Sequence, residues 1–188
     1  MESDRIRMYK GKNLPAHSPY FCTLEGLYAM NVDLLTSTSR QNAGWGANGD
    51  PFKSFLTFRP ADETIDDFYQ ELEMYWDGLL AEIPLLAASN PANMRQASAP
   101  RVSELEDPED PQDCALFRPI CQELLIGVAR GLLNWRQDDP ENPTRASVRT
   151  ALTGLGSLVW DGHSAPWRHV LYIPTNEEHT SWKMASEE

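Results

Sequence analysis

The sequence CALFRPICQELLIGVARGLLNWR, residues 114–136, is the longest apolar helical pattern in the chain. Its apolar side chains recur every three or four residues, which places them on one helical face. These are Phe117, Ile120, Cys121, Leu124, Leu125, Val128, Leu132 and Trp135. Ile126, Ala129 and Leu133 interrupt the opposite, thinly polar side. A helix that is apolar nearly all round is usually buried, so this stretch predicts the innermost helix of the fold.

Pro119 suits the first turn of this helix, because its missing N–H has no partner to lose there. We therefore expect the helix to span residues 118–136. Gly127 and Gly131 lie one turn apart, and each costs up to ~1 kcal/mol of helix propensity relative to alanine. The pair predicts a closely packed neighbour, for which a helix over residues 64–83 is the best candidate.

Two further helices are expected on either side of the central one. Thr64 is a candidate cap for the helix at 64–83, which ends before Pro84. Its apolar positions are Ile65, Phe68, Tyr69, Leu72, Tyr75, Trp76, Leu79, Leu80 and Ile83. A third helix over residues 144–160 follows Asn142 and Pro143, which suit a cap and a first position.

The strand pattern is weaker than the helical one. Short apolar runs predict strands at 53–59 and 169–173. Residues 27–35 alternate apolar and polar side chains, which favours a strand, whereas Thr23 as a cap would favour a helix there. The whole pattern predicts a single α+β domain, residues 1–188, with three main helices (64–83, 118–136 and 144–160) packed on a small sheet. The remaining segments are expected to be a flexible arm (1–19), an acidic mobile loop (88–113) and a polar tail (175–188).

Composition restricts the class of partner. The chain has 28 acidic and 16 basic residues among 188, a formal net charge of −12. This charge disfavours direct binding to nucleic acids and to anionic membranes, which need a basic surface, and favours a basic protein partner. Three cysteines without a CxxC pair, and an N-terminus without an apolar core, indicate reduced thiols and a cytoplasmic protein.

The acidic residues gather in two places. Residues 62–82 contain eight acids and no base, and residues 104–113 contain six more. The helix dipole favours those near the start of the helix, but not the later ones, which have no lysine or arginine four residues away. We therefore expect a partner-binding face, although a merely solvated acidic face is the alternative. Its predicted residues are Asp66, Glu71, Glu73, Asp77 and Glu82, with Trp45 and either Tyr69 or Trp76 as anchors.

Nucleophilic chemistry is a second possibility. Cys22 precedes a possible helix start, a location that lowers the pKa of a thiol. His169 follows late in the chain, and Asn176 or Asp161 would orient it. This order is that of papain-like hydrolases, but the residues flanking Cys22 do not match theirs.

Other chemistry has little support in the sequence. Asp161, His163, His169 and His179 crowd the C-terminal part but lack the spacing of metal ligands, so no metal is predicted. Nucleotide-binding glycine motifs, GxSxG and calcium loops are absent, and no cofactor is expected. The sequence therefore predicts an acidic intracellular protein that sequesters or inhibits a basic protein, as an immunity protein neutralises a toxin. The alternatives are a cysteine hydrolase using Cys22 and His169, and a structural subunit of an assembly.

Overall fold

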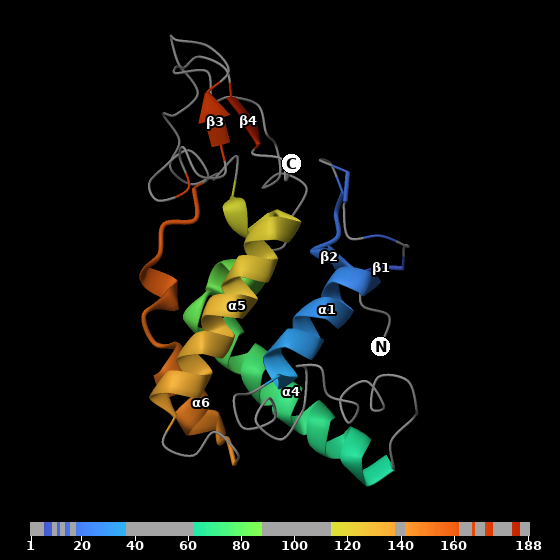
Figure 1. Ribbon diagram of the computed structural model, residues 1–188, viewed down its shortest axis with the longest axis vertical. Coiled ribbons are helices and arrows are strands. Elements are labelled where there is room, and N and C mark those ends of the chain that lie inside the picture. The colour runs from blue at the N-terminus through green and yellow to red at the C-terminus, as the bar shows by residue number, and fades with distance from the viewer. Residues whose placement is uncertain are drawn as a thin grey trace. The chain divides into compact units, whose positions relative to one another are not determined.

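The computed structural model describes ten segments of the chain, of which four contain the helices. The segments are 6–8, 11, 14–15, 18–36, 62–87, 114–137, 142–161, 167, 172–174 and 182–184. Four α-helices dominate them: α1 (Leu24–Leu35), α4 (Asp62–Glu82), α5 (Pro119–Arg136) and α6 (Arg145–Leu152) (Figure 1). Three short 3₁₀ helices accompany these: η1 (Pro84–Ala87), η3 (Ala115–Phe117) and η4 (Leu155–Ser157). With two small strand pairs, the described part is α+β but mostly helical.

The strands form two separate pairs. β1 (Ile6–Arg7) runs parallel to β2 (Cys22–Thr23), with Ile6 opposite Cys22. β3 (Tyr172–Pro174) is antiparallel to β4 (Trp182–Met184), with Ile173 opposite Lys183. The first pair includes part of the expected arm 1–19, and the second includes part of the expected tail 175–188. β3 overlaps the predicted strand 169–173, whereas the predicted strand 53–59 lies outside the described residues.

The strand predicted at 27–35 is wrong, because these residues belong to α1. The fully buried Thr23 accepts a hydrogen bond from the N–H of Gly26 through its hydroxyl, at 3.1 Å, as an N-cap does. Met30 and Leu34, one turn apart, are buried while Tyr28 is 54% exposed. The cap and the helical spacing therefore decide the conformation against the alternating pattern.

The chain divides into two compact units. Unit 1 consists of residues 1–27, 88–122 and 157–188, and unit 2 consists of residues 28–87 and 123–156. Each is described by itself, and the prediction of a single domain stays a prediction, as does the packing of the helices on a sheet.

Unit 1 has an aromatic interior. Phe21 meets the fully buried Phe117 edge to face, with ring centroids 5.9 Å apart, and the side-chain amide of Gln122 donates to the carbonyl of Phe21 at 3.1 Å. Trp160 stacks on Trp167 at a centroid distance of 5.3 Å. The two contacts of Phe21 connect segments that lie far apart in the sequence.

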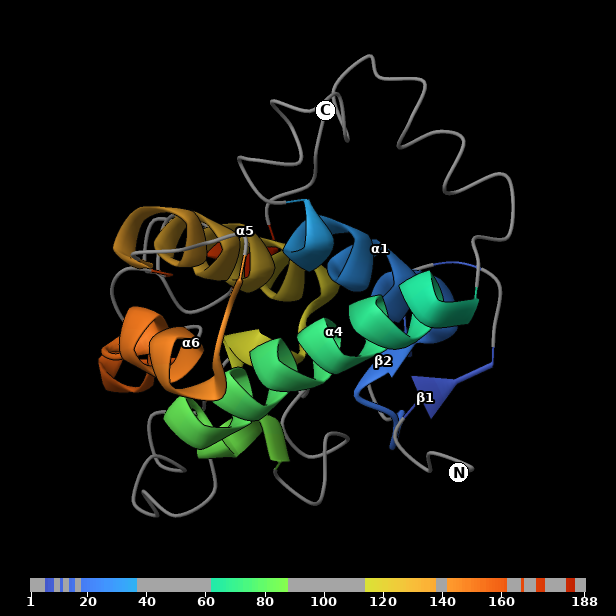
Figure 2. The same cartoon turned by 90° about the horizontal axis from the view of Figure 1, so that it is seen from below.

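Unit 2 is built on the close packing of α4 against α6 (Figure 2). A Cβ on Gly78 of α4 would lie 2.9 Å from Val148 Cγ1 and 3.0 Å from Leu152 Cδ1, both on α6. A Cβ on Gly156 would collide with the carbonyl oxygen of Glu82 at the end of α4. Glycine at these two positions therefore sets how closely α6 and η4 approach α4.

The third helix is shorter than the predicted 144–160. It begins with a capping box, in which the Thr144 hydroxyl accepts from the N–H of Ser147 and the Ser147 hydroxyl accepts from the N–H of Thr144. It ends at Leu152, and Gly154 follows with φ of 101°, a left-handed conformation that breaks the helix. Arg136 of α5 donates to the carbonyls of Ala151 and Thr153, at 3.3 and 2.9 Å, and so satisfies this helix end.

The buried face of α5 differs from the predicted one. The buried side chains are Cys121, Gln122, Leu125, Ile126, Ala129 and Leu133. Leu124, Val128 and Trp135, all assigned to the core by the sequence pattern, are 47%, 50% and 77% exposed. Among the described residues, nothing lies within 4 Å of a Cβ built on Gly127 or Gly131, so the close neighbour predicted from these glycines is not found there. The pattern misleads because α5 carries apolar side chains on both sides, and the chain covers one of them.

Candidate protein-binding surface

One face of α4 combines acidic side chains with an exposed tyrosine. Asp62, Asp66, Tyr69 and Glu73 follow one another at intervals of four, three and four residues, which aligns them along the helix. All four are exposed, Tyr69 by 64%, and Ile65 beside them is 36% exposed. The opposite face contains Tyr75 and Leu79, which are buried. We call Asp62, Asp66, Tyr69 and Glu73 the α4 stripe.

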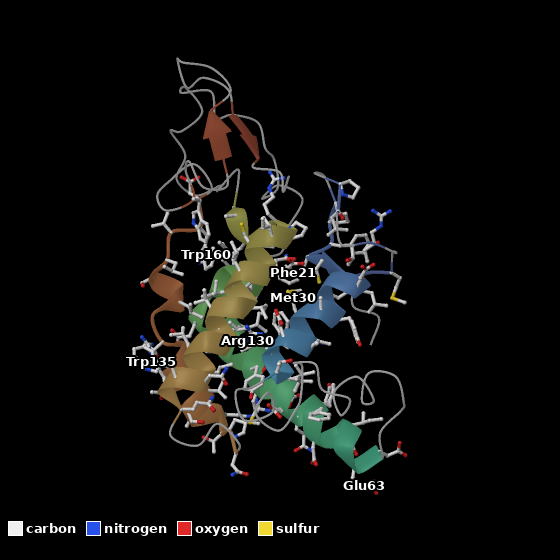
Figure 3. The ribbon with its side chains drawn as sticks, viewed as in Figure 1. Phe21, Met30, Glu63, Arg130, Trp135 and Trp160 are labelled. Carbon is white, nitrogen blue, oxygen red and sulfur yellow. The ribbon has the colours of Figure 1, made fainter. Side chains whose placement is uncertain are left out.

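Negative charge is concentrated at the N-terminal end of α4. Asp62 and Glu63 occupy the first turn, with Glu63 at the tip of the helix in Figure 3. Asp66 and Asp67 follow within the next turn, and both are exposed. Residues 62–87 contain no lysine or arginine. The helix dipole stabilises these carboxylates, so the fold tolerates a dense negative charge here.

Farther along α4, the charge is offset by α6. Arg145 donates through Nη2 to Glu73 Oε2 at 2.7 Å and through Nη1 to Asp77 Oδ2. All three side chains are about half exposed, so the pairs stabilise the fold by about 1 kcal/mol or less. The expectation that the later acids have no basic counterpart within their helix is correct, but for Glu73 and Asp77 the counterpart comes from another helix. Arg145 therefore offsets the charge of the later part of α4, at Glu73 and Asp77.

Two of the acids predicted to lie on the binding face are buried or partly buried instead. Glu71 is buried, 8% exposed, and its Oε1 accepts a hydrogen bond from the Tyr75 hydroxyl at 2.6 Å. It belongs to the interior of unit 2, since it lies on the face of α4 opposite the stripe. Glu82 is partly buried at the end of α4, where its carbonyl faces Gly156.

Of the two aromatic anchors considered on α4, only one is exposed. Trp76 is partly buried and donates its indole N–H to Asn31 Oδ1 at 2.9 Å, which fixes α4 to α1. Tyr69 carries no such contact among the described interactions and projects from the centre of the stripe. Trp45, the third anchor, lies outside the described residues, as does the acidic segment 104–113.

Of the residues of the cysteine-hydrolase alternative, the structure describes only Cys22 and Asp161. Cys22 does precede the start of α1, as one interpretation of the sequence expected, but it is only 3% exposed. His169 and Asn176 lie outside the described residues, so their geometry stays a prediction. Asp161 is held in an isolated β-bridge with Cys114. Cys22, Cys114 and Cys121 are all buried, and none is in a disulfide.

The described segments contain neither a metal-binding cluster nor a membrane-spanning helix. Within these segments, no group of three or more His, Cys, Asp and Glu side chains is arranged to hold a metal ion. His163, His169 and His179 lie outside them. Of the helices in the same segments, none combines the length and apolarity needed to cross a membrane.

Comparison with protein-family models, with curated proteins and with solved structures found no match to this chain. The functional argument therefore depends on the surface itself. An array of carboxylates around a tyrosine offers charge to a lysine or arginine and an aromatic ring to pack against it. Sequence reasoning identified the acids of this surface but did not single out the four-residue alignment around Tyr69, although the spacing carries that signal.

Proposed function

We propose that this chain is an acidic binding protein that captures a basic protein partner through the α4 stripe. The observation that carries the proposal is the alignment of exposed Asp62 and Asp66 with exposed Tyr69 in a helix without any base. The net charge of −12 supports it, because the long-range field of the chain attracts cationic proteins and repels nucleic acids. An inhibitor of a basic enzyme, such as an immunity protein that neutralises a toxin, is the form of this function that we favour.

The carboxylates and the tyrosine of the α4 stripe contribute to different steps of binding. The carboxylates at the N-terminal end of α4 accelerate encounter, since opposite charges steer diffusion. Tyr69 supplies the contact area that slows dissociation, because a tyrosine buries a large amphipathic surface at little cost in conformational entropy. Glu73 is already paired with Arg145, so its contribution is smaller than that of Asp66.

The experiment begins with capture of interacting proteins by the tagged chain in the cells that express it. Asp66→Lys, Tyr69→Ala and Asp67→Lys versions serve as parallel baits. Asp67 is the matched control, because it is exposed on the same helix and next to Asp66 but lies about 100° around the helix axis from it. A captured basic protein that depends on Asp66 and Tyr69 is then purified for stopped-flow kinetics. Labelled polylysine provides a reference that responds to charge alone.

Asp66→Lys and Asp67→Lys should slow association equally, because each changes the charge of α4 by the same two units. Asp66→Lys should also accelerate dissociation by about tenfold, as should Tyr69→Ala, whereas the control Asp67→Lys should not. Equal capture by all baits, or partners that are themselves acidic, would exclude the α4 stripe as the binding surface.

A further inference from the structure

Arg145 is the first residue of α6, and its guanidinium bridges two carboxylates of α4. Its Nη2 lies 2.7 Å from Glu73 Oε2, and its Nη1 pairs with Asp77 Oδ2. Glu73 and Asp77 lie one turn apart on α4, so one planar guanidinium can reach both. Because Glu73 belongs to the α4 stripe, a base of this chain already occupies one end of that surface.

The fold of α6 does not account for a base at this position. The N-terminal end of a helix dipole is positive, so a positive charge in the first turn is unfavourable. A capping box built from the residues on either side stabilises the start of α6, and Val148 and Leu152 pack it closely against Gly78 of α4. The cap and the packing of α6 therefore use side chains other than that of Arg145.

The two ion pairs are open to solvent. The side chains of Arg145, Glu73 and Asp77 are all about half exposed. Pairs in such surroundings are weak and exchange without any change in the core. A base that a partner brought to this part of α4 would meet the same two carboxylates and would have to displace Arg145. Because only the fraction of chains with free carboxylates is competent to bind, this contact lowers the apparent affinity.

We propose that Arg145 is an intramolecular competitor for the basic partner of the α4 stripe. It occupies Glu73 and Asp77 in the free chain, and basic side chains of the partner displace it on binding. This inference rests on the proposed function. A partner with one base gains little at Glu73, since one ion pair replaces another. A partner with several bases contacts Asp66 as well, two turns away along α4, and Arg145 thereby favours partners with clustered positive charge.

The probe for the test is a fluorescein-labelled octa-arginine peptide, titrated with the full chain and followed by fluorescence anisotropy. Arginine is chosen because its guanidinium pairs with carboxylates as that of Arg145 does. Arg145→Gln should lower the dissociation constant of the peptide about threefold more than Arg149→Gln does. Arg149 is the matched control, because it is exposed one turn farther along α6 and its loss changes the net charge equally.

A double-mutant cycle separates competition from long-range charge. Glu73→Gln should barely weaken peptide binding while Arg145 is present, because Glu73 is already paired. In the Arg145→Gln chain, the same substitution should weaken binding about threefold, since the freed carboxylate then contacts the peptide. In the Arg149→Gln chain, it should have the same small effect as in the parent, because the removal of distant charges is additive.

The outcomes distinguish this inference from the proposed function. If Asp66→Lys weakens peptide binding more than Asp67→Lys does, but Arg145→Gln and Arg149→Gln act equally, the α4 stripe binds the peptide and the inference is overturned. An additive cycle between Glu73 and Arg145 overturns it in the same way. Equal effects of the two aspartate substitutions would contradict the proposed function, and the inference with it. Circular dichroism of each variant verifies that its helices remain folded.

Discussion

The helices α4 and α5 are of similar length, 21 and 18 residues, yet they present opposite kinds of surface. Each buries one side. On its other side α4 exposes carboxylates around Tyr69, whereas α5 exposes Leu124, Val128 and Trp135. The acidic side is stable in water without a partner. The free side of α5 leaves apolar side chains 47–77% exposed, so the two helices offer different surfaces to the solvent.

Their glycines show the same contrast. Gly78 in α4 is required by the side chains of Val148 and Leu152, while Gly127 and Gly131 in α5 adjoin open space. Packing inside the chain accounts for a glycine such as Gly78. A glycine in an exposed helix has only a cost there, unless a contact with another molecule needs it. Gly78 therefore belongs to the tight packing inside unit 2, whereas no described neighbour requires a glycine at position 127 or 131.

The largest effect is expected where η4 meets the end of α4. Gly156→Ala should lower the free energy of unfolding by about 3 kcal/mol, because the new Cβ would overlap the backbone carbonyl of Glu82, which cannot rotate away. Urea denaturation followed by circular dichroism measures this. Gly127→Ala, which adds the same methyl group in open space, is the control. A neutral Gly156→Ala would show that η4 does not pack tightly on α4.

The next effect concerns the buried carboxylate of α4. Tyr75→Phe should cost about 1–3 kcal/mol, because it removes the hydroxyl that donates to Glu71 in the interior. Tyr69→Phe removes the same hydroxyl from an exposed site and should be nearly neutral. If the two substitutions have equal effects on the urea midpoint, Glu71 is not buried as described.

On α5, glycine-to-alanine substitutions are expected to raise stability and not to lower it. Gly127→Ala and Gly131→Ala should each stabilise the chain by up to about 1 kcal/mol, since alanine has the higher helix propensity and meets no described neighbour. Gly78→Ala should be destabilising, because Val148 and Leu152 would have to move. Thermal unfolding at low concentration compares the three. Destabilisation by either alanine in α5 would mean that another part of the chain covers that face.

The smallest effect is expected for the exposed ion pairs. Arg145→Gln should lower stability by about 0.5 kcal/mol at low salt, since it separates α6 from Glu73 and Asp77 at sites about half exposed. The difference from the parent chain should shrink in high salt, where the pairs are screened. A salt-independent loss would indicate that the stem of Arg145 acts through packing instead.

Sequence periodicity predicted the long helices well and their orientation less well. α4 at 62–82 and α5 at 119–136 lie close to the predicted 64–83 and 118–136, because both patterns are long and periodic. The buried face of α5 could not be predicted, since apolar residues occupy both sides and periodicity cannot tell which side the chain covers. α1 was predicted as a strand, with a Thr23-capped helix as the alternative, because Tyr28, Met30, Val32 and Leu34 satisfy a two-residue alternation.

The candidate surface was predictable in composition but not in its details. The run of acids in 62–82 is visible in the sequence, and Asp66 is exposed as expected. The pairing of Arg145 with Glu73 and Asp77 was not visible, because these residues are 72 and 68 positions apart and meet through the packing of α6 on α4. Glu71 was misplaced for a related reason, since burial of a carboxylate depends on a tyrosine one turn away.

The stacked indoles of Trp160 and Trp167 have an optical consequence. Their rings lie 5.3 Å apart at an angle of 22°, close enough for the electronic transitions of the two chromophores to couple. Coupled transitions split into a pair of circular-dichroism bands of opposite sign, which a single indole does not produce. Unit 1 therefore contains its own chromophore pair, and loss of that band pair would follow its unfolding without any added label.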